Sequence, residues 1–357
     1  MYSKSKYSDA EVLRCPACGA NIVYSPITGR WTCSSCGGTF NEDDFKNVAD
    51  ENVAADKNAA EVEPTVTESA QPELDVFRCQ SCGAELVTDS NTAATFCAYC
   101  GSADIIKDRL EGEYRPDYVL PFTISKDEAL NCYTKHCKEA SFVPGHFFDL
   151  KNIKIQGTYV PFCLYSGRSE GTLKGQFEQT SSTNRDMIDV YSYVRSGKMD
   201  FARIPADVSV KMDNALMDSI EPFDFNQLKE FNYAYLSGFL AEKYDVERDE
   251  SGQLKRVSGR MESSLQNRLS KGSVSSSDLK SNFSAIEYVL MPVWMLCTEF
   301  EGREYIFAVN GQSGKTEGFL PCDAAKKWLW FFILTISISA VISLPLYFFI
   351  VWLFNNA

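Results

Sequence analysis

The longest apolar pattern in the chain lies at its C-terminal end. Residues 328–354 carry no charge over 27 positions, and Lys326 and Lys327 stand immediately before them. Such a run is typical of a membrane-spanning helix, and a buried core helix is the alternative. The helix would measure about 40 Å, so tilt or a kink at Pro345 is expected in a bilayer. Because positive residues favour the cytoplasmic side, we expect a single-pass anchor in the cell membrane at residues 326–357, with the bulk of the chain in the cytoplasm.

The predicted anchor also contains a stripe of small polar residues. Thr335, Ser339 and Ser343 recur every four positions and therefore share one helix face. Such stripes let membrane helices approach closely and form hydrogen bonds, which predicts a helix–helix interface and leaves a homo-oligomer open. The alternative is that the three residues are simply tolerated in lipid, as single Ser and Thr residues are.

Residues 114–325 mix the helical and the strand periodicities, which predicts a mixed α/β central domain in a chain of the α+β class. Ser125, with Glu128 at the capping-box position, predicts a helix that starts at Lys126 and ends before residues 142–147. Pro161 lies inside a strand predicted at 157–165 and suggests a sheet edge or a bulge. The other predicted elements are strands near 177, 190–194 and 201–210, helices at 231–246 and 253–269, and paired strands at 283–300 and 304–309.

Two short segments of the central domain resemble each other. Residues 159–165 and residues 290–296 both carry a proline at the third position, and each is followed by a polar turn and a further apolar run. The resemblance predicts that the domain contains two similar β-rich units.

Eight of the 13 cysteines form one pattern that occurs twice, at an offset of 64 positions (79 − 15). In each copy, two C-x2-C pairs are separated by fourteen residues. Each pair points two thiolates at one metal, and two pairs complete a closed tetrahedral site, which is structural rather than catalytic. We therefore predict two zinc ribbons, at residues 1–48 and 78–113, each holding a structural Zn2+, with iron as the main alternative metal. The predicted ligands are Cys15, Cys18, Cys33 and Cys36 in the first ribbon and Cys79, Cys82, Cys97 and Cys100 in the second.

The charge of the chain bears on its partners. A net charge of −13, from 35 basic and 48 acidic residues, argues against a general nucleic-acid binder, which needs Lys and Arg against phosphates. The ribbons themselves are poor in charge, with Arg30 between the first four cysteines and Glu85 and Asp89 between the second four. Protein contact is therefore expected of them. No basic and apolar leader is evident, so we expect a reducing compartment, where cysteines favour metal over disulfide.

Residues 49–77 separate the two ribbons and are acidic, rich in alanine and poor in aromatic residues. This composition predicts a disordered, self-repelling linker. Spacing is its expected role, and an acidic docking tail is the alternative.

Other candidate chemistry in the sequence is sparse. Gly314-Lys315-Thr316 resembles the end of a phosphate-binding loop, but Val309 occupies the position of the first glycine and no helix is expected to follow. We expect a tight turn at Asn310-Gly311 instead. Cys132 and His136 share a helix face without further ligands nearby, and no nucleophile–base pair stands out. Cys137 lies on the same predicted helix as Cys132, and Cys163, Cys297 and Cys322 are interpreted as small apolar residues.

Several segments together resemble the bacterial transcription-factor-IIB-type zinc-ribbon membrane proteins, whose members are often labelled PriA-like helicases or phage replisome organisers. The segments are the two cysteine patterns and residues 120–122, 125–126, 159–162, 211–224, 235–245, 291–294 and 308–315. The resemblance implies a bacterial membrane protein and, as a partner, a membrane-organising complex of the flotillin/SPFH type. Relatives with a single ribbon differ from this chain, which has two predicted ribbons. The sequence also lacks the complete phosphate-binding loop of a helicase.

Three functions remain as hypotheses. The first is a non-enzymatic, membrane-anchored cytoplasmic adaptor or scaffold whose zinc ribbons recruit protein partners. The second is a membrane-tethered nucleic-acid-binding or replication-associated factor, which the charge balance makes the weaker interpretation. The third is an enzyme whose site in the central domain is assembled from residues far apart in the sequence.

Overall fold

The computed structural model describes residues 15–20, 22–33, 35–41, 44, 74–81, 84–89, 97–98, 105–108, 116–180, 188–209, 212–236, 238–242 and 250–356. Most of the predicted acidic linker lies outside these residues. Strand β4, however, begins at Leu74, within the last residues assigned to that linker.

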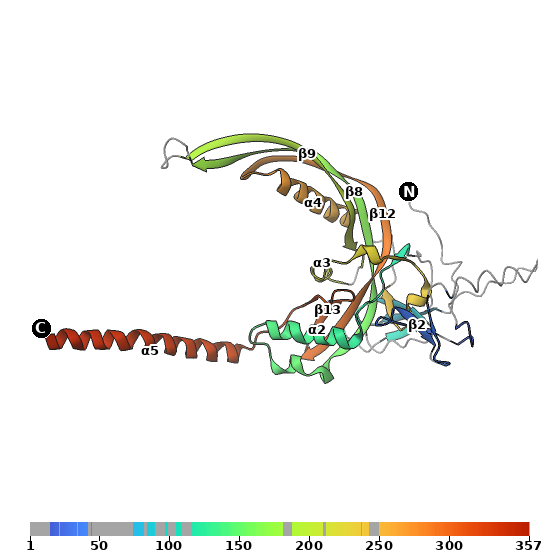
Figure 1. Cartoon of the computed structure of the whole chain (residues 1–357), viewed down its shortest axis with the longest axis horizontal. Coiled ribbons are helices and arrows are strands. Elements are labelled where there is room, and N and C mark those ends of the chain that lie inside the picture. The colour runs from blue at the N-terminus through green and yellow to red at the C-terminus, as the bar shows by residue number, and fades with distance from the viewer. Residues whose placement is uncertain are drawn as a thin grey trace, which may run out of the picture.

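The described strands form two sheets, and the described α-helices other than the C-terminal one lie beside the larger sheet (Figure 1). The small sheet has the order β1-β2-β3, with β1 (Ile22–Ser25), β2 (Arg30–Cys33) and β3 (Thr39–Phe40). The large sheet has the order β10-β7-β12-β8-β11-β5-β4-β6, with β9 beside β8 and with β13 and β14 beside β12. Its strands are β4 (Leu74–Cys79), β5 (Glu85–Asp89), β6 (Ile105–Asp108), β7 (Tyr118–Val119), β8 (Lys154–Thr180), β9 (Ile188–Asp207), β10 (Lys229–Glu230), β11 (Leu240–Glu242), β12 (Ser273–Phe300), β13 (Arg303–Asn310) and β14 (Thr316–Gly318). The α-helices are α2 (Lys126–Glu139), α3 (Asn214–Ser219), α4 (Glu250–Leu269) and α5 (Ala324–Asn356), and the short 3-10 helices are η2 (Gly145–Phe148), η3 (Leu150–Asn152), η4 (Phe225–Gln227) and η5 (Tyr233–Leu236).

The large sheet contains two similar units, as the sequence repeat predicted. Strands β8 and β12 pair antiparallel, with Val160 opposite Met291 at the centre of the repeat. Before its proline, each strand pairs in parallel with a short strand, β11 or β7; after it, each pairs antiparallel with β9 or β13. The chain therefore runs twice through a short strand, a helix, a long strand and an antiparallel strand: β7-α2-β8-β9 and β11-α4-β12-β13.

Pro161 lies inside the sheet, so its expected place at an edge is wrong. It stands where β8 changes partner from β11 to β9, and Val208 N donates to Pro161 O at 3.0 Å. In a strand, the N and O atoms of one residue point to the same side. The side of Pro161 is the one where β11 ends and β9 begins, so the N–H that proline lacks would have pointed between these two strands. The irregularity in the β8–β9 register lies at Tyr165 and Gly167 instead.

Beyond this centre, β8, β9 and β12 continue as a long three-stranded arm that curves away from the rest of the sheet, with α4 along its concave side (Figure 1). Val257, Met261 and Leu265 of α4 are buried. Two of them, Val257 and Met261, pack in one cluster with Cys163 and Tyr165 of β8. The helix thus covers the base of the arm.

The predicted α2 and α4 are confirmed, and the predicted helix at 231–246 is wrong. Ser125 and Glu128 form the expected capping box at α2. In the 231–246 segment, η5 is followed by Gly238 at a φ of 87° and then by β11. The apolar residues whose spacing predicted a helix face are instead buried in a turn and in β11, which pairs with β5 and β8.

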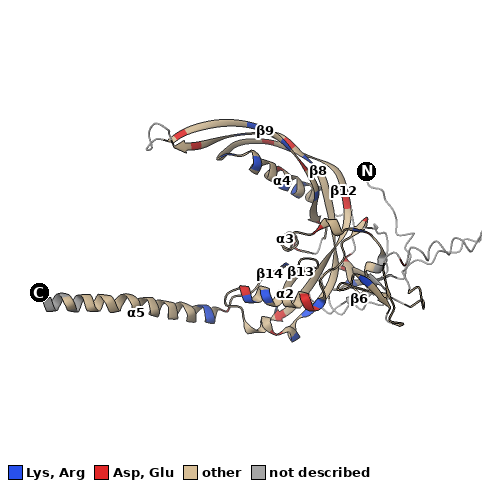
Figure 2. Cartoon of the chain, in the orientation of Figure 1, with Lys and Arg blue, Asp and Glu red and all other residues tan. Residues whose placement is uncertain are grey.

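Helix α5 projects from the body, and its first 26 residues, Ala324–Phe349, are long and apolar enough to cross a membrane. None of this window is buried, and Figure 2 shows basic residues at the end of the helix next to the body. Asp323 N donates to Phe142 O at 2.7 Å, which ties the start of α5 to the loop after α2. The helix is continuous past Pro345.

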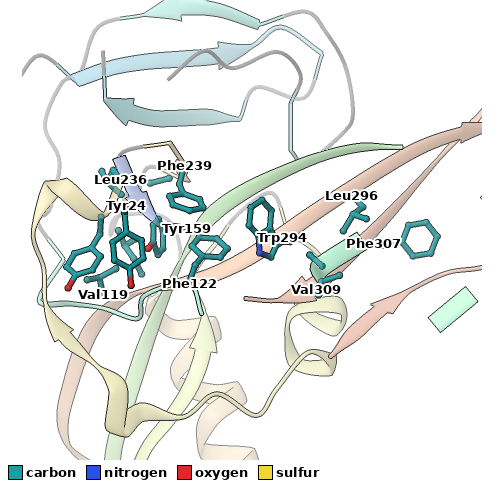
Figure 3. Close-up of a cluster of buried hydrophobic side chains, with 14 of the residues drawn as sticks. Tyr24, Val119, Phe122, Tyr159, Leu236, Phe239, Trp294, Leu296, Phe307 and Val309 are labelled. Atoms are coloured by element: carbon teal, nitrogen blue, oxygen red, sulfur yellow. The ribbon is translucent and has the colours of Figure 1, made fainter. Parts of the chain in front are cut away.

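An aromatic core fills the space between the first ribbon and the large sheet (Figure 3). The Phe122 and Phe239 rings stack with centroids 4.3 Å apart, and Tyr159 and Trp294 pack edge-on against Phe122. Trp294 Nε1 donates to Ile124 O at 3.1 Å, so the buried indole N–H has an acceptor.

The second ribbon segment joins the large sheet directly. Strand β5 pairs with β11, and Leu86, Cys79 and Cys97 are buried in one cluster with Leu120 and other side chains of the central sheet. The second ribbon segment therefore packs on the central domain.

Candidate metal centre

The first four predicted ligands come together in two turns of nearly the same geometry. Cys15 N donates to Ala20 O and Gly19 N to Cys15 O, both at 2.8 Å; Cys33 and Gly37 repeat these bonds at 2.8 and 3.0 Å. Gly19 and Gly37 both have a φ of 71°, a conformation that glycine adopts without strain. Each C-x2-C pair therefore closes as a tight knuckle that directs two sulfur atoms to one point.

The four sulfur atoms are spaced as a tetrahedral metal requires. All lie within 4.8 Å of one another, and the Cys15–Cys36 and Cys18–Cys33 Sγ atoms are 3.6 Å apart. A zinc–sulfur bond of about 2.3 Å gives a tetrahedral edge of about 3.8 Å, whereas a disulfide needs about 2.05 Å. Cys15, Cys18, Cys33 and Cys36 thus form a four-thiol group that could hold a metal ion.

The local backbone favours thiolate at one position. Cys36 N donates to Cys33 Sγ at 3.4 Å, and this hydrogen bond is the main cause that lowers the pKa of Cys33 to about 6. Cys15 and Cys33 are buried, whereas Cys18 and Cys36 are exposed. Two of the four thiols are therefore shielded by protein and two face outward, an arrangement compatible with a structural metal site at the protein surface.

Three aromatic rings join this centre to the central domain. Trp31, two residues before Cys33, packs against Tyr24 and against Tyr235 of η5, with ring centroids 5.2 and 5.0 Å away. Tyr24 and Tyr235 are 5.3 Å apart, so the three rings contact one another mutually. Because all three are buried, the ribbon is part of the core and not a freely tethered module.

The second predicted zinc site is described only in part. Cys79 and Cys97 are both buried in the same cluster, and Cys82 and Cys100 lie outside the described residues. The second site stays a prediction.

The other sequence candidates have structural roles. Residues 311–315 form the turn between β13 and β14, where Gly314 N donates to Asn310 O, and a strand follows instead of the helix that a phosphate-binding loop requires. Cys132 and His136 lie on α2, and no second thiol or carboxylate group of metal-binding geometry occurs among the described residues. Thr335, Ser339 and Ser343 are exposed on α5, where Thr335 Oγ1 donates to Phe331 O at 2.7 Å.

A charged network at the base of the arm has no counterpart in the sequence analysis. Arg256 of α4 donates to the buried Asp207 of β9 at 2.6 Å, and Arg260 donates to Glu221 at 2.8 Å. Burial raises the pKa of Asp207 and of Glu221, and the facing arginines oppose this shift. The only indication of this network in the sequence is that Arg256 and Arg260 lie four positions apart on a predicted helix. Their acidic partners come from distant segments of the chain.

No family model matches the chain, and no solved structure matches it significantly. The chain is 35% identical over 332 residues to a protein of Bacillus subtilis (strain 168) called uncharacterized protein YdjG. The match covers 89% of this chain and 92% of the relative. Identity at this level over most of both chains shows that the protein belongs to the same family as YdjG.

Proposed function

We propose that the protein is a non-enzymatic adaptor, or scaffold, which α5 anchors in the bacterial cell membrane and whose metal-stabilised ribbons recruit protein partners on the cytoplasmic side. The observation that carries the proposal is the contrast between the two ends of the structure. The four-thiol ribbon is packed into the body through Trp31 and Tyr235, whereas α5 projects from the body as an apolar helix whose membrane-length window has no buried residue.

The exposed side of the first ribbon supports protein contact. Ile27, in the turn between β1 and β2, is 76% exposed, and Val23 on β1 is 45% exposed. Arg30 is the only charge between Cys15 and Cys36, so this surface lacks the cations that nucleic acid would require. An exposed apolar tip on a rigid support suits a small protein–protein contact. The resemblance to zinc-ribbon membrane proteins makes a flotillin/SPFH-type complex the partner we favour.

The test is a comparison of protein complexes from native membranes. The full chain would be tagged at its N-terminus, extracted in mild detergent and treated with nuclease, beside Ile27→Glu and Cys33→Ser variants. We expect stoichiometric protein partners that survive nuclease and are lost with both variants, while Leu150→Ser, a change of an exposed apolar residue in η3, retains them. Partners that disappear with nuclease would instead support the replication-associated function, and a set of partners unchanged by either ribbon variant would refute recruitment by the ribbon.

A further inference from the structure

The outer end of the arm presents an apolar row on its convex face. Ile188, Val190 and Val194 alternate along β9 and so point to one side, and they are 63%, 59% and 65% exposed. They lie opposite Thr180, Glu178 and Lys174 of β8. The alternate positions of the two strands face α4. On that side Leu173 of β8 is buried, and Leu269 of α4 lies close to Gly197 of β9. The row is therefore on the face that α4 leaves uncovered.

The arm and α5 extend toward the same side of the molecule. Figure 1 views the chain down its shortest axis and shows β8 and β9 curving over toward the side to which α5 projects. The loop end of the arm thus lies on the side of the body where a bilayer around α5 would be. A contiguous row of exposed apolar residues at this position is typical of a membrane or protein contact surface.

The charges of the outer arm fit an anionic lipid surface. The described segments 171–180, 188–198 and 271–280 carry five basic residues and three acidic ones, although the whole chain has a net charge of −13; basic positions on the arm are visible in Figure 2. Lys271 Nζ lies 3.8 Å from the centroid of the Phe177 ring, and Arg195 lies over Tyr193. Tyr191, stacked on Phe177, is 47% exposed. These rings and cations lie on the α4 side of the strands, opposite the apolar row, so the two faces of the outer arm carry the two kinds of residue. Aromatic rings beside Lys and Arg are the residues that favour the membrane interface.

We propose that the outer end of the arm binds the headgroup region of the same bilayer that α5 enters, with Ile188, Val190 and Val194 dipping below the phosphates and the nearby basic residues facing anionic lipid. This inference rests on the proposed membrane anchoring. The outer end of the arm then forms a second membrane contact beside α5.

Tryptophan fluorescence in vesicles tests the proposal with the full chain. The protein would be reconstituted into phosphatidylcholine–phosphatidylglycerol vesicles whose acyl chains carry bromine close to the headgroup end, since bromine quenches nearby indoles. The native tryptophans of α5, Trp328, Trp330 and Trp352, report on the anchor in every sample. Val194→Trp and Val190→Trp report on the arm. Ile27→Trp is the matched control, because Ile27 is equally exposed and apolar but lies on the first ribbon, away from α5 (Figure 1).

We expect quenching of the α5 tryptophans, quenching of the emission added at residues 190 and 194, and no quenching of the emission added at residue 27. Quenched α5 tryptophans with unquenched arm tryptophans would overturn the arm contact and leave the anchor intact. Arm tryptophans shielded from aqueous iodide but not quenched by lipid would also overturn it, since that result indicates contact between two copies. Unquenched α5 tryptophans would overturn the anchor and the arm contact together.

Discussion

Pro161 and Pro292 occupy equivalent places in the two halves of the large sheet. Leu290 stands opposite Pro161 and Tyr159 opposite Pro292, so the two prolines flank the central pair symmetrically. Val208 N donates to Pro161 O at 3.0 Å, and Gly311 N donates to Pro292 O at 2.9 Å. Each proline thus sits at the position where a long strand exchanges a short parallel partner for a long antiparallel one.

Replacing either proline by alanine should destabilise the fold to a similar extent. The new N–H would point into the gap between two partner strands in a buried position, and a buried donor without an acceptor costs about 1–3 kcal/mol. Thermal unfolding of the detergent-solubilised chain, followed by circular dichroism, measures the effect. Pro321→Ala, in a partly exposed loop before α5, is the control. A neutral result at both residue 161 and residue 292 would show that other groups accept the new N–H.

Trp31 should contribute to the free energy of unfolding of the whole body and not only to that of the ribbon. Trp31→Ala removes the ring that joins Tyr24 to Tyr235, and truncation of a buried tryptophan costs about 3–5 kcal/mol. We expect a lower unfolding midpoint for the entire β-sheet signal, whereas Ile27→Ala in the same hairpin should change the free energy of unfolding by less than about 0.5 kcal/mol. A loss confined to the metal content, with the main transition unmoved, would contradict this coupling.

The Arg256–Asp207 pair should show strong coupling in a double-mutant cycle. Either single change, Arg256→Met or Asp207→Leu, leaves a largely buried charge without its partner, and we expect each to cost about 3–5 kcal/mol. The double variant should cost much less than the two single changes together, because no isolated charge remains. Urea unfolding gives the four free energies. The exposed Arg168–Asp200 pair is the matched comparison and should contribute at most about 1 kcal/mol; equal coupling at both pairs would argue against a buried network.

Acid should weaken the capping box at the start of α2. Ser125 N and Oγ contact Glu128 Oε2 at 2.7 and 2.8 Å, and these hydrogen bonds lower the pKa of Glu128 below its ordinary 4.5. Because the folded pKa is depressed, the stabilisation is present above pH 4.5 and is lost as the pH falls through the folded pKa. The difference in unfolding midpoint between the native chain and Glu128→Gln should therefore shrink on acidification. A difference that stays constant with pH would show that the carboxylate charge has no role.

The structure also shows why some elements followed from the sequence and others did not. Helix α2 and the β12–β13 hairpin were predictable because their signals are local: a capping box, and two apolar runs around the turn at Glu301 and Gly302. The 231–246 segment failed because its apolar residues meet β5 and β8, strands that distant parts of the chain supply. The cysteine spacing located the four-thiol group that could hold a metal ion, whereas the packing of Trp31 on Tyr235 joins residues with no common motif.

The stripe Thr335, Ser339 and Ser343 of α5 should promote association between copies of the chain and should not be needed for insertion of α5 into the membrane. Thr335 Oγ1 and Ser343 Oγ already donate to Phe331 O and Ala340 O in their own helix, so their hydroxyls are compatible with lipid. Replacing Thr335, Ser339 and Ser343 together by leucine makes the helix more apolar, and membrane fractionation should be unchanged. The larger side chains would keep two helices apart, and we expect association between copies to weaken by about 1 kcal/mol for each lost contact. Cross-linking in native membranes measures this. The matched control replaces Ile333, Ile338 and Val341 by leucine, which keeps the helix apolar and changes only faces away from the stripe. If the stripe variant and the control associate equally well, the stripe is not an interface.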